Sequence, residues 1–273
     1  MSRKLLTKIF LYLVMVIVLV VFLYPLIYAF NASFKTNREF IIDPVGLATS
    51  FVWQNYIEAW QRSDFGTFFF NSLFYTIINV IAVLVMSVFV AFPLARGYLG
   101  KLGKVIFWLF LASMFLPDGT IPRFIGMLNV GLYNTRLGYI LVGIGARGLF
   151  MLVFIDFIKG LPRELDEAAS IDGCGYFRYM WSIIFPLMKP ALASMAILQA
   201  NDAWNEYLNA VIYLSDRRLF PITRGLVVFT SAFNVEWPLR IASLVIVAVP
   251  IIILYVFLQK YIIESQVNTS IKG

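Results

Sequence analysis

One face of a long apolar stretch carries the side chains best suited to bind a solute. Projected at about 100° per residue, they fall within an arc of roughly 120°, with Trp204 nearly opposite. They are Gln199, Asp202, Asn205, Glu206, Asn209 and Tyr213. A charge at the bilayer centre costs at least about 2.5 kcal/mol, so Asp202 and Glu206 should face a wet cavity or a partner. We expect the stripe to line a solute pathway, where carboxylates and amides bind hydroxyl groups. The alternative is that it packs against another membrane protein or a buried arginine.

Arg147 is the basic residue that could neutralise those acids. It lies near the middle of the preceding apolar stretch, where a lone guanidinium would be costly. We predict that it pairs with Asp202 or Glu206 and belongs to the same pathway. An unpaired Arg147 would instead indicate an acidic solute.

A second group of residues predicts a short acidic helix between two apolar stretches. Pro162 suits the first turn of a helix, and the helix dipole favours acids in that turn. The acids there are Glu164, Asp166 and Glu167. The spacing predicts a helix over residues 162–171 with an acidic surface, which suits a basic partner.

Small residues shape the rest of this loop. Ala168 and Ala169 predict a thin face that the backbone of a partner can approach closely. Gly173 permits the left-handed geometry that ends a helix. Beyond this turn an apolar stripe at helical spacing can lie in the membrane interface or against neighbouring spans. Its members are Phe177, Met180, Trp181 and Ile184.

The chain lacks the groups that most catalysis requires. It has no histidine and one cysteine, Cys174, so histidine acid/base chemistry, Cys/His zinc sites and an internal disulfide are excluded. No loop has calcium-site spacing, and no Walker-type phosphate-binding segment occurs. We expect no catalytic residue, metal or cofactor in this chain, so a separate subunit must hydrolyse any ATP.

Composition identifies a polytopic membrane protein. Hydrophobic residues make up 61% of the 273 residues and charged residues only 14%. A bilayer core needs roughly 20 apolar residues in a helix, and backbone groups in lipid must be satisfied within the segment. The net charge of +7 fits membrane topology and anionic headgroups and indicates no nucleic acid. We expect an all-α membrane protein.

Six spans can be drawn in a single transmembrane domain over residues 1–273, with an N-terminal span and core spans within residues 65–260. They cover residues 9–30, part of 65–95, a third from Val105, then 137–158, 187–214 and 239–258. The third should be short, because Pro117 and Asp118 follow after about three turns. The first is too long for a signal peptide and should stay attached. The polar tail, residues 264–273, should be extended.

Positive residues set the expected orientation. Lysine and arginine favour the cytoplasmic side in short loops, and they are more numerous there if both termini are cytoplasmic. When acidic residues are counted as well, the difference in net charge between the two sides becomes larger. The loop of residues 160–186 would then be cytoplasmic.

The acidic loop resembles the EAA loop of ABC importer permeases. That pattern runs Glu-Ala-Ala, three residues, Gly, nine residues, Ile, one residue and Leu-Pro. Six of its seven fixed positions are met, by Glu167, Ala168, Ala169, Gly173, Ile183 and Pro186, whereas Phe185 replaces leucine. The resemblance implies that these six residues couple the chain to an ATPase through a coupling helix between spans four and five.

Other short motifs extend the resemblance along the chain to the carbohydrate-uptake branch, of the maltose-type second-permease kind. They are Ser33-Phe34-Lys35, Asn55-Tyr56, Asn71-Ser72-Leu73, Leu132-Tyr133-Asn134-Thr135, residues 161–165, Trp204-Asn205 and Lys272-Gly273. The branch implies a homologous permease subunit, two ATPase subunits that bind ATP and Mg, and an extracellular sugar-binding protein. It also implies a prokaryotic plasma (inner) membrane.

The sequence therefore predicts the permease subunit of an ATP-driven importer for a carbohydrate, such as an oligosaccharide, that supplies half of the translocation pathway. An ion-coupled secondary transporter is the alternative and would show inverted repeats, of which none is convincing. A membrane enzyme is a third option, which the lack of a convergent catalytic set opposes.

Overall fold

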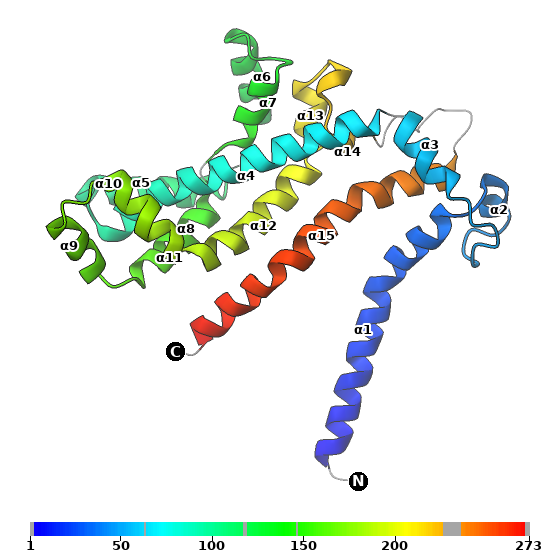
Figure 1. Cartoon of the computed structure of the whole chain (residues 1–273), viewed down its shortest axis with the longest axis horizontal. Coiled ribbons are helices and arrows are strands. Elements are labelled where there is room, and N and C mark those ends of the chain that lie inside the picture. Colours follow the sequence, from blue (N-terminus) through cyan, green and yellow to red (C-terminus); the bar gives the residue numbers. More distant parts are fainter. Residues whose placement is uncertain (1–2, 63, 117–118, 146, 226–235, 271–273) are drawn as a thin grey trace. The chain divides into compact units, whose positions relative to one another are not determined.

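The computed structural model describes residues 3–62, 64–116, 119–145, 147–225 and 236–270. These residues form helices and connecting loops, without a strand (Figure 1). The helices are α1 (Arg3–Ser33), α2 (Asn37–Ile42), α3 (Gln54–Arg62), α4 (Phe65–Arg96), α5 (Gly100–Ser113), α6 (Thr120–Asn129), α7 (Arg136–Gly143), α8 (Gly148–Lys159), α9 (Glu164–Ile171), α10 (Tyr176–Tyr179), the π-helix η1 (Met180–Ile184), α11 (Phe185–Leu187), α12 (Lys189–Asn205), α13 (Leu208–Tyr213), the 3-10 helix η2 (Arg217–Leu219), α14 (Ile222–Gly225) and α15 (Trp237–Ser270).

Three helices in the described part of the chain are long and apolar enough to cross a membrane. They include residues of α1, α4 and α15, over Thr7–Ser33, Phe65–Arg96 and Trp237–Phe257. Two bent pairs reach the required length together, α7 with α8 and the segment Tyr176–Leu187 with α12. The expected third span is α5, whose 14 residues are fewer than the roughly 20 that a bilayer needs. The count of six therefore stays a prediction.

Three sequence expectations differ from the structure. The fourth span is interrupted between Gly143 and Gly148, and the fifth is interrupted at Glu206, whose backbone is extended. Residues 264–270 of the tail are helical rather than extended, because α15 continues to Ser270 and no glycine or proline follows Pro250 within it. Pro117 and Asp118, expected to break the third span, lie outside the described residues, as does Lys272-Gly273.

The chain divides into two compact units: unit 1 comprises residues 1–67 and 225–250, and unit 2 comprises residues 68–224 and 251–273. In unit 1 the Asn55 amide donates to the carbonyl oxygens of Ser33 (2.7 Å) and Lys35 (2.9 Å). The hydroxyls of Ser33 and Tyr56 lie 2.6 Å apart. The Lys35 ammonium is buried and donates to the Asp43 carbonyl. These contacts hold the segment after α1 against α3.

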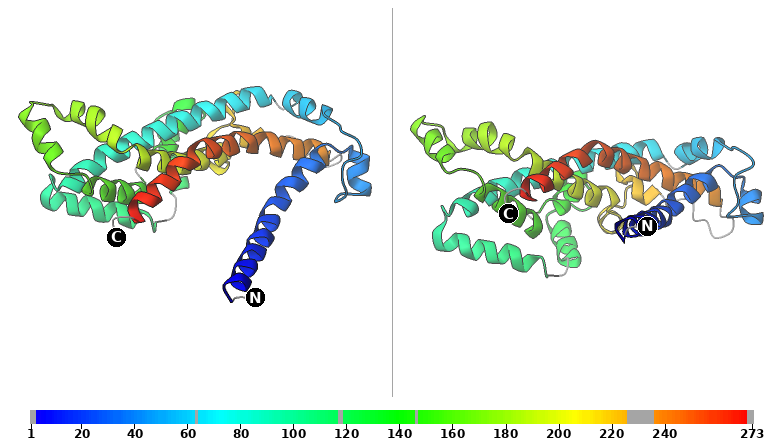
Figure 2. Two further views of the ribbon diagram at one scale, coloured as in Figure 1. Left: turned by 60° about the horizontal axis from the view of Figure 1, so that its bottom comes forward. Right: turned by 90° about the horizontal axis from the view of Figure 1, so that it is seen from below.

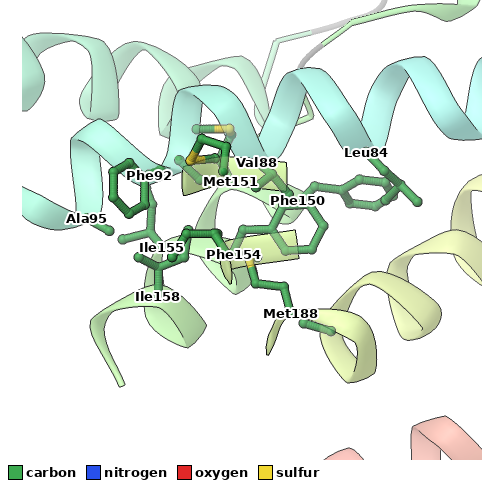
Figure 3. Packing of buried hydrophobic residues seen from close by; sticks show 14 of the residues in the cluster. Leu84, Val88, Phe92, Ala95, Phe150, Met151, Phe154, Ile155, Ile158 and Met188 are labelled. Carbon is green, nitrogen blue, oxygen red and sulfur yellow. The ribbon is translucent and has the colours of Figure 1, made fainter. Parts of the chain in front are cut away.

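Unit 2 is built on an apolar core between α4, α8 and the segment α10–α12. Figure 3 shows Val88 and Phe92 of α4 facing Phe150 and Phe154 of α8, with Met188 beside them. All five are almost fully buried. Close packing of this kind makes the core a rigid body that can transmit displacement.

Asparagines pin the loops at the other side of unit 2, where α6, α7 and α13 gather (Figure 1). Asn134 adopts a left-handed backbone with φ of 57°, and its side-chain oxygen accepts the N–H groups of Ser215 and Asp216. The Asn71 amide donates to the carbonyl oxygens of Arg218 and Phe220. Both residues belong to the short motifs above, and both act here as structural ties.

Candidate functional site

The loop helix α9 projects from one end of unit 2 (Figure 2). A Schellman turn ends it: the N–H of Cys174 donates to the Ala169 carbonyl (2.9 Å) and that of Gly173 to the Ser170 carbonyl (3.1 Å). Gly173 has φ of +67°, as the sequence predicted from its position. The helix begins at Glu164, two residues later than expected.

The faces of α9 differ in exposure. Glu167 and Ala168 are exposed, and Ile171 is 86% exposed. Ala169 is buried and packs in the core of unit 2. The expected two-alanine face is therefore wrong for Ala169, because the helix turns it toward α4 and α10. The exposed surface consists of acidic and small residues beside one large apolar side chain.

The segment after Gly173 returns the chain to the core. Ile183 is half-buried against it, and Pro186 is exposed in the short helix α11. The expected apolar stripe divides, since Met180 and Ile184 are fully buried whereas the rings of Phe177 and Trp181 are exposed and contact Phe89. At about 100° per residue Met180 and Ile184 lie on one edge of the stripe and Phe177 and Trp181 on the other, so the boundary of the core runs through it.

Arg96, at the end of α4, holds the start of this loop. Its guanidinium Nε lies 2.7 Å from Asp166 Oδ2, and its Nη1 donates to the Leu161 carbonyl at 3.1 Å. Tyr179 donates its hydroxyl to the same carboxylate. From the sequence alone, Arg96 is predicted only to mark the positively charged end of a span. Its distance of 70 residues from Asp166 hid this role.

Unit 2 also contains a cavity of about 580 Å³. Its walls come from α4, α5, α6, α7, α8, α12 and α13. The polar lining side chains are Tyr75, Asn79, Ser113, Arg123, Tyr139, Arg147, Gln199, Asp202, Glu206 and Asn209. The volume lies within the range of roughly 300–1,000 Å³ typical of small-molecule sites.

Four of the six stripe residues line this cavity: Gln199, Asp202, Glu206 and Asn209. Asn205 and Tyr213 do not line it, which corrects the projection on one continuous helix. Asn205 is exposed and its amide donates to Asn201. Tyr213 is buried in a separate apolar cluster and donates to the Thr120 carbonyl at 2.8 Å. The break at Glu206 rotates the residues that follow.

Charged and amide groups in the cavity are paired. Arg147 forms an ion pair with Asp202, which confirms the predicted pairing. The buried Gln199 donates through Nε2 to Asn79 Oδ1 at 2.5 Å, while its own Oε1 has no hydrogen-bond partner in the described part of the chain. The Glu206 carboxylate accepts the N–H of Asn209 at 2.9 Å and so caps α13. The cavity thus offers polar groups held in fixed positions.

Sequence reasoning missed the wall opposite the stripe. Tyr75 and Tyr139 contact edge to face with ring centroids 4.8 Å apart, and Tyr75 donates to the Leu219 carbonyl. Arg123 donates to the Val142 carbonyl at 3.4 Å. Asn79 gave the usable signal, because it and Asn71 are the two amides within the long uncharged run of residues 65–95.

Comparison with known proteins places the chain among transport proteins. The family model described as "Binding-protein-dependent transport system inner membrane component" matches residues 64–266. The chain is 31% identical to the arabinooligosaccharides transport system permease protein AraQ of Halalkalibacterium halodurans, covering 92% of this chain and 91% of that protein. It is 29% identical to the diacetylchitobiose uptake system permease protein NgcG of Streptomyces coelicolor, covering 90% and 83%.

A solved structure has the same fold. It is a chain of a bacterial ABC transporter involved in the import of the acidic polysaccharide alginate, with a TM-score of 0.82 and 26% identity. The match covers 96% of this chain and 99% of that one. The apolar helices described above are therefore those of a membrane-embedded transport protein.

Proposed function

We propose that this chain is the permease subunit of an ATP-driven importer for a carbohydrate, such as an oligosaccharide. The chain belongs to the family of binding-protein-dependent transport system inner membrane components. The observation that carries the proposal is the polar cavity of unit 2. The relatives AraQ and NgcG of this chain are named for oligosaccharide substrates, and a chain of the alginate importer has the same fold.

The chemistry of the cavity supports a solute rich in hydroxyl groups. A sugar hydroxyl both donates and accepts, so it can satisfy carboxylates, amides and guanidinium groups at once. Gln199 supplies a buried acceptor oxygen that lacks a partner in the described residues. An unsatisfied buried acceptor costs about 1–3 kcal/mol, and a hydroxyl donor would remove that cost.

The roles of individual residues follow from their placement. Gln199, Asp202, Glu206, Asn209 and Arg147 bind or guide the solute from the cavity wall. Asn205 and Tyr213 lie outside it and maintain the helices around it.

The loop of residues 160–186 couples the chain to a separate ATPase. Glu167 and Ala168 meet a basic groove of that subunit, and Ile171 adds an apolar contact. Ala169, Gly173, Ile183 and Pro186 hold the loop in shape. ATP and Mg bind to the partner, since this sequence has no Walker-type segment.

The complete assembly contains a homologous permease, two ATPase subunits and an extracellular sugar-binding protein. This chain supplies half of the pathway, and access alternates as the two permeases rock against each other. Both termini and the loop lie on the cytoplasmic side of the prokaryotic inner membrane. No observation favours ion coupling.

The test is transport by the intact assembly. The tagged chain is purified with its natural partners, reconstituted in liposomes, and supplied with neutral and acidic oligosaccharides of different linkage together with the binding protein. We expect uptake of at least one carbohydrate only when ATP is present on the ATPase side. Uptake driven by a proton or sodium gradient without ATP, or no uptake of any carbohydrate, would overturn the proposal.

Two asparagines provide a matched pair of variants. Asn209→Ala removes a cavity side chain, whereas Asn205→Ala removes an exposed side chain outside the cavity. We expect the first to raise the KM for import several-fold and the second to leave it unchanged. Equal effects of the two variants would contradict the assignment of the cavity.

A further inference from the structure

The guanidinium of Arg96 joins the end of α4 to the stretch of residues 161–166 that opens α9. It is 7% exposed and lies at the last residue of α4. It contacts the Leu161 carbonyl, the Pro162 carbonyl at 3.4 Å and both oxygens of the Asp166 carboxylate, at 2.7 and 3.2 Å. All of these acceptors belong to the short stretch that opens α9.

The chemistry of this contact makes it a directional joint. A guanidinium presents a planar array of N–H donors. Here Nη2 donates to Asp166 Oδ1, whereas Nε lies close to Oδ2 without forming a hydrogen bond in the described part of the chain, so the carboxylate is held by charge and by one hydrogen bond. Tyr179 at the end of α10 donates to the same carboxylate. The start of α9 is therefore held to both α4 and α10 by side chains that lie 70 and 13 residues away.

Without this joint α9 would be attached more loosely. Four residues separate it from α8 and four separate it from α10, and the second connection includes the left-handed Gly173. Apart from the joint, the helix contacts the core through the small side chain of Ala169 and through neighbours such as Leu161. Small apolar contacts permit sliding, whereas an ion pair supported by hydrogen bonds to three acceptors resists it.

The other end of α4 reaches the cavity. Tyr75 and Asn79 line the cavity, and the helix continues without interruption from them to Arg96. Asn79 and Arg96 are 17 positions apart, which corresponds to roughly 25 Å at about 1.5 Å per residue. The buried face of α4 packs on α8 along this length (Figure 3). A displacement of α9 can therefore reach the cavity wall along one helix.

We propose that Arg96 is a positioning residue that transmits the movement of α9 to α4 and so to the wall of the cavity. This inference rests on the proposed function, because it assumes that a motor moves α9. It assigns α4 a direct mechanical role in addition to the two segments that flank the loop. Asp166 and Tyr179 complete the joint.

The first test measures coupling in the complete reconstituted assembly. Arg96→Lys keeps the charge but loses the planar array of donors, and Tyr179→Phe removes one hydrogen bond while keeping the ring. Arg163→Lys, an exposed arginine of the same loop, is the matched control. We expect Arg96→Lys to lower the number of solute molecules imported per ATP by at least about fivefold, with Tyr179→Phe smaller and Arg163→Lys unchanged.

A structural role alone predicts a different pattern. Yield or thermal stability would fall, but each assembled complex would import the normal number of molecules per ATP. That outcome for both Arg96→Lys and Tyr179→Phe would overturn the inference. If Arg96→Lys does not assemble, Tyr179→Phe still decides between the two patterns.

The second test needs no solute. In a Cys174→Ser background, spin labels at Ser170→Cys on α9 and Tyr98→Cys just after α4 report their separation with and without nucleotide. We expect one unchanged distance in the parent and a broadened, nucleotide-dependent distribution after Arg96→Lys. A distance that varies with nucleotide in the parent would overturn the inference. If carbohydrate import fails but this pattern holds, only the substrate assignment fails.

Discussion

The Arg147 guanidinium and the Asp202 carboxylate form an ion pair in the wall of the cavity, although 55 residues separate them along the chain. The pair joins the start of α8 to α12 across the cavity. Both side chains remain partly exposed, at 40% and 50%. Such exposure leaves both groups available to a solute and limits what the pair contributes to folding.

Loss of the pair should change transport more than stability. Arg147→Ala leaves Asp202 without its partner in the cavity, so we expect import to fall roughly tenfold, equivalent to about 1.4 kcal/mol. Because the groups are half-exposed, the free energy of unfolding should fall by no more than about 1 kcal/mol. Initial import rates and thermal unfolding of the purified assembly check both. Unchanged import with Arg147→Ala would contradict a role in the pathway.

Two neighbouring glycines test the support of Gln199. A Cβ at Gly143 would lie 2.1 Å from the Asn79 amide nitrogen, whereas a Cβ at Gly145 would meet no atom within 4 Å. Gly143→Ala must displace Asn79 and weaken its hydrogen bond to Gln199, worth about 1 kcal/mol. We expect a several-fold rise in KM for Gly143→Ala and none for Gly145→Ala. Identical KM values for the two variants would refute this link.

The Schellman turn after α9 gives a second glycine pair. Gly173 has φ of +67° with open space around its Cβ position, and Gly175 has φ of −66° with equally open space. Gly173→Ala should cost roughly 1–2 kcal/mol of backbone strain, and Gly175→Ala should cost little. Co-purification of the ATPase and hydrogen exchange in α9 measure the effect. Equal protection of α9 in both variants would contradict the strain argument.

Charge reversal on the exposed face of α9 should disturb its partner surface. Glu167→Arg places a positive charge against the basic groove that we propose, so we expect the amount of co-purified ATPase to fall at least tenfold at low salt. Glu167→Gln is the milder control and should reduce it less. Added salt should weaken the repulsion, because the Debye length shortens from about 30 Å at 0.01 M to about 10 Å at 0.1 M ionic strength. Undiminished association of the Arg variant would contradict an acidic contact here.

The stability of the segment after α1 should depend on pH in the acid range. Hydrogen bonds from the Ser50 hydroxyl, then from the Thr49 N–H, lower the pKa of Glu39 from its usual 4.5 to about 2. A carboxyl whose folded pKa is lowered stabilises the fold above its unfolded pKa, and this contribution is lost as pH falls through the folded pKa. The loss should therefore occur between pH 4.5 and about 2.

Fluorescence of Trp53, beside Phe34 in this segment, reports the change, and Glu39→Gln provides the control. We expect the parent to lose its native signal in that acid window. The Gln variant should show a weaker pH dependence there. An identical acid transition in both proteins would show that another group controls it.

The apolar runs predicted the long helices well, because burial in lipid needs only length and hydrophobicity. The start of α4 at Phe65 and its end at Arg96 match the uncharged run and the positive residue after it. Composition cannot reveal where such a helix breaks when the cause is tertiary. The interruption at Glu206 is an example, since its backbone carbonyl accepts the hydroxyl of Thr223, which lies 17 residues away.

Spacing predicted local geometry and partly predicted contacts. Gly173 was placed correctly, because a positive φ is a property of one residue and its neighbours. The prediction that Arg147 pairs with Asp202 or Glu206 is confirmed with Asp202, because isolated charges in apolar runs have few candidate partners. The pair of Arg96 and Asp166 could not be predicted, since each lies in the terminal turn of a helix beside other charged residues that could also have been partners. Burial of Ala169 depended on the direction of α9, which no local pattern gives.

Helix α1 has a separate meaning for how the protein evolves. Its most apolar window is 0% buried by the described remainder of the chain. Within unit 1, the order of valine, leucine and isoleucine in this window therefore sets no packing contact. A variant of α1 that keeps the same residues in a different order should leave the fold of unit 1 intact, so substitutions that keep this stretch hydrophobic should be tolerated there.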